Sequence, residues 1–352
     1  MRCLASPEAL VNLFIKRTKD RPFSFQFHGG PYTRTVLSLH SFRILEILVA
    51  HADRWRSARL IIGKADELKL LTKAKYRFGQ LHSVQISALG VPDHLIYSNL
   101  FQHAPNLTRV YLSHYYQLPW SSITVFHIRA QHTMGRFFAH LDKMTCLEEL
   151  VIRGIPLLHD VTKIGPIELP SLKILSVEHY SPLSLIKTPA LEKLYLADAL
   201  VGGVPAAETL LCGVSHLQTL SFGVHSFDAA RIIDCTPELD HLILSCNFAF
   251  FVAFQPLLES LVSRSTAHSL RRISIYVSNL QPSTYGLLTV VIKSWEKLQF
   301  PKLHLVSVHV DEHRIEIQKG AVADLVRVGA DKGFGIDVGS DTFPTMVPFE
   351  TW

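Results

Sequence analysis

Apolar residues along the chain recur in a short pattern, leucine–any–any–leucine–any–leucine, in which isoleucine, valine or phenylalanine can replace leucine. The last four positions alternate between apolar and other residues, and this period of two places the apolar side chains on one face of a strand. Successive copies begin 16 to 33 residues apart, most of them 22 to 26. Such spacing is typical of leucine-rich repeats. A degenerate first copy and ten good ones are WRSARL (55–60), LHSVQI (81–86), LTRVYL (107–112), ITVFHI (123–128), LEELVI (147–152), LKILSV (172–177), LEKLYL (191–196), LQTLSF (217–222), LDHLIL (239–244), LRRISI (270–275) and LHLVSV (303–308).

The repeat predicts how these strands associate. One such unit cannot bury its apolar face alone, whereas stacked units form a parallel sheet with a continuous core. We therefore expect an α/β fold, a leucine-rich-repeat-like solenoid with a curved parallel sheet on the concave side and helices and loops on the convex side. In LEKLYL, for example, Leu191, Leu194 and Leu196 are expected in the core, with Lys193 and Tyr195 on the opposite face.

Between the strands the apolar residues follow a helical period. The sequence predicts helices over 38–55, 65–78, 94–104 and 135–144, and loops in the intervals of 16 and 19 residues. Ser6 and Pro7 are typical of a helix start; the helix that follows leads into a strand at 22–27. Near the other end, a helix over 314–333 and a last strand at 334–338 are expected.

Length and composition suit one extended repeat domain. Of the 352 residues, 48% are hydrophobic and 18% are charged, which favours a globular chain over a disordered one. We expect a single leucine-rich-repeat-like domain over 1–352. It would comprise an N-terminal cap region (1–54), the repeats (55–310) and a C-terminal cap and tail (311–352).

The net charge of +5 is concentrated near the start of the chain: residues 1–80 hold 15 Lys and Arg against 6 Asp and Glu. A basic region can attract an acidic protein, a nucleic acid or a membrane. Few aromatic residues are interleaved with the basic run and no known nucleic-acid module is recognised. A solvated basic face is thus the simpler interpretation, and we expect neither a nucleic acid nor a membrane as partner.

Cysteine usage and hydropathy bear on the compartment. The five cysteines form no C-x-x-C pair, which favours a reducing environment over a disulfide framework. The first residues do not resemble a signal peptide, and no stretch of about 18 uninterrupted apolar residues occurs. We therefore expect an intracellular protein, cytoplasmic or nuclear.

One segment resembles a catalytic motif. HVDEH (309–313) matches the H-x-x-E-H zinc-peptidase signature, which needs both histidines on one helix. Here it follows directly on a predicted strand, in an expected turn. We recognise no nucleophile or phosphate-binding motif elsewhere, and the sequence predicts no enzyme activity, no metal and no cofactor.

Residues near the start of the chain resemble a known family. An I-K-R-T helix end followed by P-F-S-F-Q-F, then I-L-E-I-L-V-A-H-A-D-R-W-R-S-A-R-L and Q-L-H-S-V-Q-I, resembles the region after the F-box in fungal F-box/leucine-rich-repeat-like proteins. LPSLKIL and TPALEKLYL are also similar to that family. We call the six residues that carry the resemblance most clearly the helix-end motif: Ile44, Leu45, Leu48, His51, Arg54 and Trp55.

The resemblance implies a protein-binding scaffold similar to the substrate-recognition part of an F-box ubiquitin-ligase receptor. No F-box-like stretch occurs in this sequence. A cullin–RING ligase adaptor is therefore an expected partner only if an F-box lies upstream. Two alternatives stay open: an interaction scaffold without an F-box and without a ligase role, and, more distantly, a parallel β-helix carbohydrate-active enzyme.

Binding would use the side chains that alternate with the core leucines, because a parallel stack presents them as a concave surface. Tyrosine and arginine are the residues most often found as hot spots of protein interfaces. The alternative is that these side chains only solvate a sheet face. The candidates for binding a protein partner are Arg59, Arg109, Tyr111, His127, Lys193, Tyr195, His241 and Arg272.

Overall fold

The chain forms two compact units, Met1–Ile164 (unit 1) and Gly165–Trp352 (unit 2). The boundaries of the predicted cap and repeat regions stay predictions. No helix in the described part of the chain is long and apolar enough to cross a membrane. The structure, a computed structural model, describes residues 6–29, 36–89, 91–92, 96, 99–129, 134–154, 165–178, 183–196, 203–223, 229–247, 257, 269–278, 305–310, 323, 327, 330 and 335–339.

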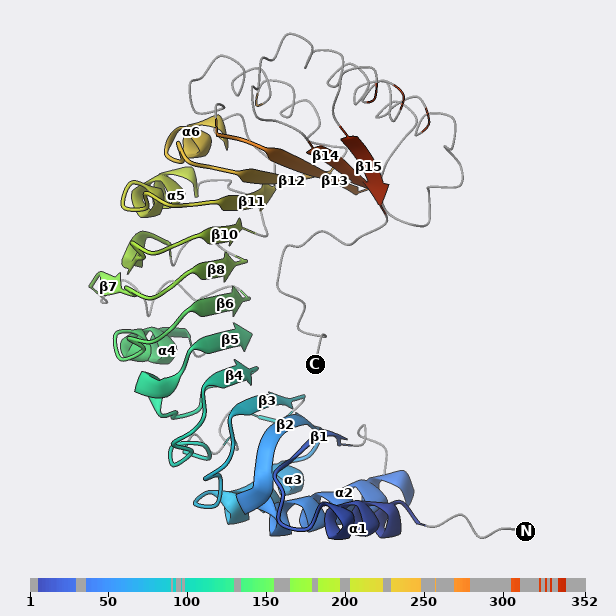
Figure 1. Ribbon diagram of the computed structural model, residues 1–352. Coiled ribbons are helices and arrows are strands. Elements are labelled where there is room, and N and C mark those ends of the chain that lie inside the picture. Colours follow the sequence, from blue (N-terminus) through green and yellow to red (C-terminus); the bar gives the residue numbers. More distant parts are fainter. Residues whose placement is uncertain are drawn as a thin grey trace. The chain divides into compact units, whose positions relative to one another are not determined.

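Unit 1 is built on parallel strands that pair with one another in sequence order (Figure 1). Each strand from the second onward coincides with a predicted repeat, and all but the first of these begin two residues into the six-residue pattern. The alternation of apolar positions thus predicted both the strands and their parallel association. The strands are β1 (Phe23–His28), β2 (Trp55–Ile62), β3 (Ser83–Ala88), β4 (Arg109–Leu112), β5 (Val125–Arg129) and β6 (Glu149–Arg153).

Helical segments lie between some of these strands, and α1 and α2 lie side by side next to the first strands (Figure 1). Ser6 caps the first helix as expected, its hydroxyl accepting a hydrogen bond from the backbone N–H of Ala9 at 3.3 Å. The short interval between β4 and β5 contains bends, irregular segments and one 3₁₀ turn, and no α-helix. The helical segments are α1 (Pro7–Thr18), α2 (Val36–Ala50), η1 (Ala52–Arg54), α3 (Ala65–Leu71), η2 (Thr72–Ala74), η4 (Trp120–Ser122) and α4 (Met134–Leu141).

Three helix predictions were wrong in part. The helix expected over 65–78 is α-helical only to Leu71 and ends after the 3₁₀ turn at Ala74. The helix expected over 38–55 ends at Ala50, because the chain turns through η1 and Trp55 already belongs to a strand. In the segment predicted as a helix over 94–104, residues 99–103 form turns. Pro105 follows directly, and a residue before proline is disfavoured in the helical conformation.

Unit 2 repeats the same scheme, with parallel strands paired in sequence order (Figure 1). A separate pair of two-residue strands, β7 (Ile167–Glu168) and β9 (Ile186–Lys187), was not predicted. The helical segments are η6 (Leu183–Leu185), α5 (Val204–Leu211) and α6 (Ala229–Asp234). The main strands are β8 (Ile174–Val177), β10 (Lys193–Leu196), β11 (Thr219–Gly223), β12 (His241–Asn247), β13 (Arg272–Ser278), β14 (Leu305–Val310) and β15 (Gly335–Gly339).

The last predicted elements are described only in part. The strand expected at 334–338 is β15. Most of the helix expected over 314–333 lies outside the described residues; positions 323, 327 and 330 within it are helical.

Burial follows the predicted register. In β10 and the residues before it, Leu191 and Leu194 are 0% exposed and Leu196 is 4% exposed, whereas Lys193 and Tyr195 are partly exposed. Strand geometry sends alternate side chains to opposite faces of a sheet. One face of each sheet therefore carries the core leucines; we call the other face, with the alternating side chains, the polar face.

A chain of aromatic contacts crosses the core of unit 1 and was not predicted. The ring centroids of Phe25 and Trp55 are 4.8 Å apart, those of Trp55 and Phe78 5.4 Å, those of Phe78 and Phe101 5.4 Å, and those of Phe101 and Tyr116 5.6 Å. The other four members of this chain, Trp55, Phe78, Phe101 and Tyr116, are completely buried. Because offset or edge-to-face aromatic pairs add to the free energy of burial, this aromatic spine links successive repeats.

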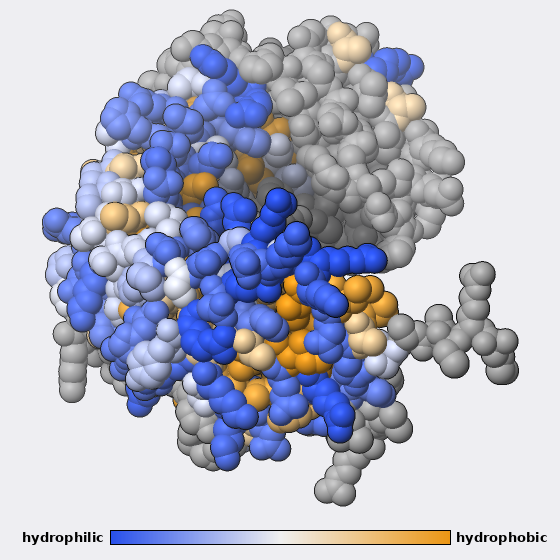
Figure 2. Space-filling view, turned by 60° about the horizontal axis from the view of Figure 1, so that its bottom comes forward, coloured by the Kyte–Doolittle hydropathy of each residue, from blue (hydrophilic) through white to orange (hydrophobic). Residues whose placement is uncertain are grey.

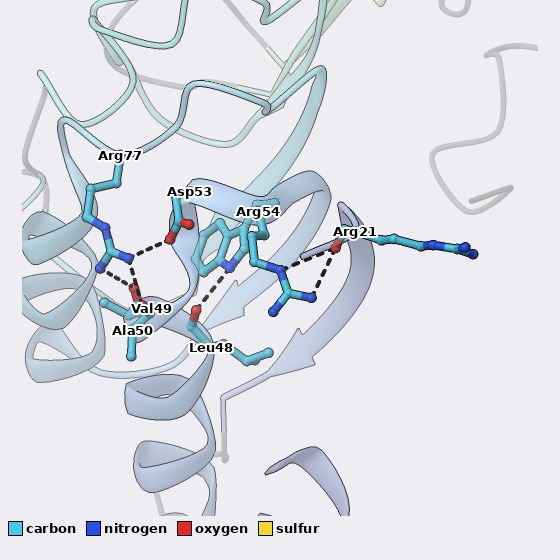
Figure 3. Close-up of polar contacts among 8 residues, drawn as sticks. Arg21, Leu48, Val49, Ala50, Asp53, Arg54 and Arg77 are labelled. Carbon is cyan, nitrogen blue, oxygen red and sulfur yellow. Dashed lines mark hydrogen bonds and ion pairs between the residues drawn. The ribbon is translucent and has the colours of Figure 1, made fainter. Parts of the chain in front are cut away.

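The helix-end motif forms the junction between α2, α1 and the first strands (Figure 3). The indole Nε1–H of Trp55 donates to the carbonyl of Leu48 at 3.0 Å, inside the core. The guanidinium of Arg54 donates to the carbonyl of Arg21 at 3.0 and 3.3 Å and to the hydroxyl of Thr18 at 2.7 Å. Two adjacent residues of the motif thus hold the end of α2 and the turn before β1.

A second arginine completes this junction from the other side (Figure 3). Arg77 donates to the carbonyl of Ala50 at 2.7 Å and to that of Val49 at 3.4 Å, and forms an ion pair with Asp53 at 2.5 Å. The last carbonyls of a helix have no partner within it, and a cationic side chain there is favourable. The position of Arg77 therefore helps to explain why α2 ends at Ala50.

Candidate protein-binding face

The strand register of unit 1 brings three of the predicted residues into one row on its polar face. Arg59 lies beside Gln85, Gln85 beside Tyr111, and Tyr111 beside His127, on the neighbouring strands β2 to β5. Arg109 precedes Tyr111 by two residues on β4, so it lies on the same face one row earlier. Residues up to 68 positions apart in the sequence thus form one continuous surface.

Two of the predicted residues in this row are buried, which corrects the expectation that their side chains are exposed; Gln85 in the same row is buried as well, at 8% exposed. Tyr111 is 5% and His127 1% exposed, and their rings meet edge to face with centroids 4.4 Å apart. The His127 Nε2 lies 2.7 Å from a carboxylate oxygen of Glu149 on β6. Their cross-strand neighbours cover them, so Arg59, which is partly exposed, and Arg109, which is exposed, offer more accessible surface.

The same face carries two further arginines that we did not single out. Arg129 and Arg153 are register partners at the ends of β5 and β6. Each lies one residue beyond the six-residue pattern, so the pattern does not include them, and they are placed on this face only because β5 and β6 extend to them. Arg129 is exposed, and no ion pair joins it to another described residue. With Arg59 and Arg109 they make the polar face of unit 1 basic.

In unit 2 three predicted residues share a row. Lys193 lies beside Thr219, Thr219 beside His241, and His241 beside Arg272, across β10 to β13. Tyr195 is partly exposed and lies two residues further along β10. The structure therefore groups the predicted residues within each unit rather than scattering them.

His241 and Arg272 have defined partners. The Nε2 of His241 lies 2.9 Å from the hydroxyl of Ser274, and Arg272 pairs with Asp240 at 3.0 Å. The pKa of His241 is lowered to about 4, mainly by burial and secondly by the charge of Arg272, while the charge of Asp240 opposes the shift. His241 is consequently neutral at pH 7, and Lys193 and Arg272 are the charged members of this row.

The described residues of these faces offer hydrogen bonding, charge and packing. Among the described residues, no group of three or more His, Cys, Asp and Glu side chains is arranged to hold a metal ion. Within HVDEH, His309 and Val310 belong to β14, and residues 311–313 lie outside the described part. His309 is therefore in a strand and not on the helix that the zinc signature requires.

Comparisons with known proteins do not assign this chain to a family, so the protein is classified by its fold. No model of a known protein family matches the chain, and no curated protein is recognisably similar to it in sequence. The structure defines an α/β protein with parallel strands in sequence order and helices between some of them.

Proposed function

We propose that this protein is a leucine-rich-repeat-like solenoid that binds another protein through the polar faces of its sheets and has no enzyme activity. The observation that carries the proposal is the set of exposed or partly exposed arginines Arg59, Arg109 and Arg129, which β2, β4 and β5 place on one face of the sheet. A core needs only the apolar positions; aligned polar and aromatic side chains on the opposite face are what a partner can recognise.

A more specific role is the recognition of substrates for a cullin–RING ubiquitin ligase, by analogy with the F-box/leucine-rich-repeat-like proteins. The helix-end motif supports this analogy because Arg54 and Trp55 make defined contacts in the first part of the fold. An F-box would have to lie upstream of this sequence. If it does not, the same face serves an interaction scaffold with no ligase role.

The parallel β-helix alternative is less favoured, because α3, α4 and α5 lie between consecutive strands of the sheets. Helices in these positions are typical of leucine-rich repeats.

Face-dependent binding can be tested with charge reversals. We expect Arg109→Glu combined with Arg129→Glu to remove specific partners in quantitative affinity purification from cells. The matched control is Arg56→Glu combined with Arg136→Glu, which reverses two exposed arginines at other positions of unit 1. Circular dichroism would verify that both variants fold. If both double variants bind the same partners as the unchanged protein, the polar face of unit 1 is not the binding surface.

The ligase role needs a separate test. We expect the protein, with any upstream sequence its transcript encodes, to bind the purified cullin–RING adaptor. If the protein does not bind the adaptor, but the charge reversals on the polar face do remove partners, the scaffold without a ligase role is favoured.

A further inference from the structure

Helix α1 carries an exposed apolar surface. Leu10, Leu13 and Phe14 are 56%, 43% and 45% exposed, and their spacing of three and four residues places them on one side of the helix. Figure 2 turns this end of unit 1 forward and shows hydrophobic surface bordered by hydrophilic residues. Single exposed apolar residues are normal, whereas a group of them marks an interaction site.

The exposed leucines Leu10 and Leu13 are not among the contacts that attach α1 to the rest of the unit. Ile15, on another side of the helix, is 5% exposed and packs into the core. Glu8 accepts a hydrogen bond from His40 of α2 at 2.5 Å. Phe14 meets Phe23 edge to face, with centroids 5.9 Å apart, which fixes its ring while leaving nearly half of it exposed. The helix is thus anchored by other contacts and presents a preformed apolar surface.

A group of positive charges follows directly on the apolar surface. Figure 3 shows that the Arg21 side chain extends away from the contacts made by its own carbonyl group. Asp20 is the one acidic residue between these cations in the sequence. None of the cations forms an ion pair with a described residue. We call this group the basic cluster; its members, all exposed, are Lys16, Arg17, Lys19 and Arg21.

We propose that the apolar surface of α1 and the basic cluster together dock an amphipathic helix of another protein, with its apolar stripe on Leu10, Leu13 and Phe14 and acidic residues against the basic cluster. A helix laid against an apolar surface uses anchors spaced as these three are. Acidic residues are favoured in the first turn of a helix, so the partner helix would begin near the basic cluster.

The placement of charge favours a protein over a membrane surface. Helices that lie on anionic membranes carry lysine and arginine along their whole polar face. In α1 the cations are confined to the last turn, while the first turn contains Glu8, whose pKa is lowered to about 2 by its hydrogen bond to His40. The surface is therefore polarised along the helix axis, as complementarity to a second helix requires. It is also distinct from the polar faces of the sheets.

The test uses fluorescence anisotropy of the full chain with two synthetic peptides of about 16 residues. Both carry leucines at helical spacing; one begins with glutamates and the other has lysines in their place. We expect the glutamate peptide to bind at least about tenfold more tightly than the lysine peptide. We also expect its affinity to fall when NaCl is raised from about 50 to about 500 mM.

Variants locate the binding surface. Leu10→Ser combined with Leu13→Ser should weaken binding of the glutamate peptide at least about tenfold. Leu89→Ser, an exposed leucine elsewhere in unit 1, should leave it unchanged. Equal binding by the double variant, equal binding of the two peptides, or no binding of either would overturn the proposal. So would association with phosphatidylserine vesicles in the absence of peptide binding, which would assign the surface to a membrane. Because the polar faces remain intact in these variants, loss of this interaction is distinguishable from failure of the proposed function.

Discussion

Replacing Arg54 with alanine tests whether the helix-end motif stabilises unit 1. Arg54 is 9% exposed, and its guanidinium holds the carbonyl of Arg21 and the hydroxyl of Thr18. Its Cζ atom also lies 5.4 Å from the centroid of the Phe23 ring. Arg54→Ala removes all of these contacts together, and with them the link between η1 and the turn that joins α1 to β1.

The expected loss of unfolding free energy is about 3 kcal/mol. A hydrogen bond from a charged donor contributes about 1.5–3 kcal/mol, and a cation–π contact about 0.5–1 kcal/mol at a partly exposed site. Two effects reduce the sum. Thr18 keeps its own hydrogen bond to the carbonyl of Ile15 at 2.9 Å, and Arg21 is exposed, so water can reach its carbonyl. A range of about 2–4 kcal/mol follows.

Equilibrium unfolding in urea, followed by circular dichroism and tryptophan fluorescence, measures this loss. Arg56→Ala is the matched control, since Arg56 is exposed two residues further along the chain and should change the unfolding free energy by less than about 0.5 kcal/mol. Arg54→Lys keeps the charge but not the planar set of donors, so its loss of unfolding free energy should lie between those of Arg54→Ala and Arg56→Ala. If Arg54→Ala proved no more harmful than Arg56→Ala, a stabilising role for these contacts would be refuted.

Three further predictions concern other parts of the fold. Leu194→Asp should abolish the folding transition of unit 2, because it places an unpaired charge in the core. Tyr195→Ala should leave a cooperative unfolding transition. The reverse result in denaturation curves would refute the strand register. Tyr116→Phe should leave the unfolding free energy unchanged or raise it by about 1 kcal/mol, because the buried hydroxyl of Tyr116 makes no hydrogen bond to any described residue and burial raises its pKa. A loss above about 1 kcal/mol in urea unfolding would contradict this. The free energy of unfolding should fall by up to about 3 kcal/mol as the pH is lowered from about 6.5 through 4, because His241 is protonated at a higher pH in the unfolded state than in the folded state. His241→Asn should flatten the dependence of unfolding free energy on pH in this range. An unchanged slope in this variant would count against the lowered pKa of His241.

The strands could be predicted from the sequence because their signal is local. Within LEKLYL, alternation over four residues is enough to assign Leu194 and Leu196 to one face and Tyr195 to the other. The parallel arrangement also followed, since a repeated unit with one apolar face can bury it only by stacking.

The accessibility of the candidate site could not be predicted in the same way. Tyr111 and His127 lie on the expected face, but each is covered by neighbours on adjacent strands, and Glu149, 22 residues after His127, closes the group. These contacts depend on cross-strand register, which the pattern of a single strand does not contain. Arg129 was missed for a simpler reason: β5 extends one residue past the pattern.

The end of α2 shows the same limit. An apolar stripe continues in the sequence to Trp55, so periodicity alone extends the helix. The helix stops at Ala50, where the carbonyl accepts a hydrogen bond from Arg77, 27 residues later in the chain. The aromatic spine was missed because its members after Trp55 lie between the repeats, where no short period marks them.

The contacts of the helix-end motif change what the family resemblance implies. Arg54 and Trp55 are buried and bind backbone carbonyls or a hydroxyl within unit 1, so selection for stability alone would preserve them. The motif therefore supports a shared fold more strongly than a shared ligase role. In the functions that we propose, binding depends instead on exposed side chains such as Arg129 on the polar face and Leu13 on α1, which the motif does not contain. Because these residues do not contribute to the core, substitutions there can change binding while Arg54 and Trp55 continue to hold the fold.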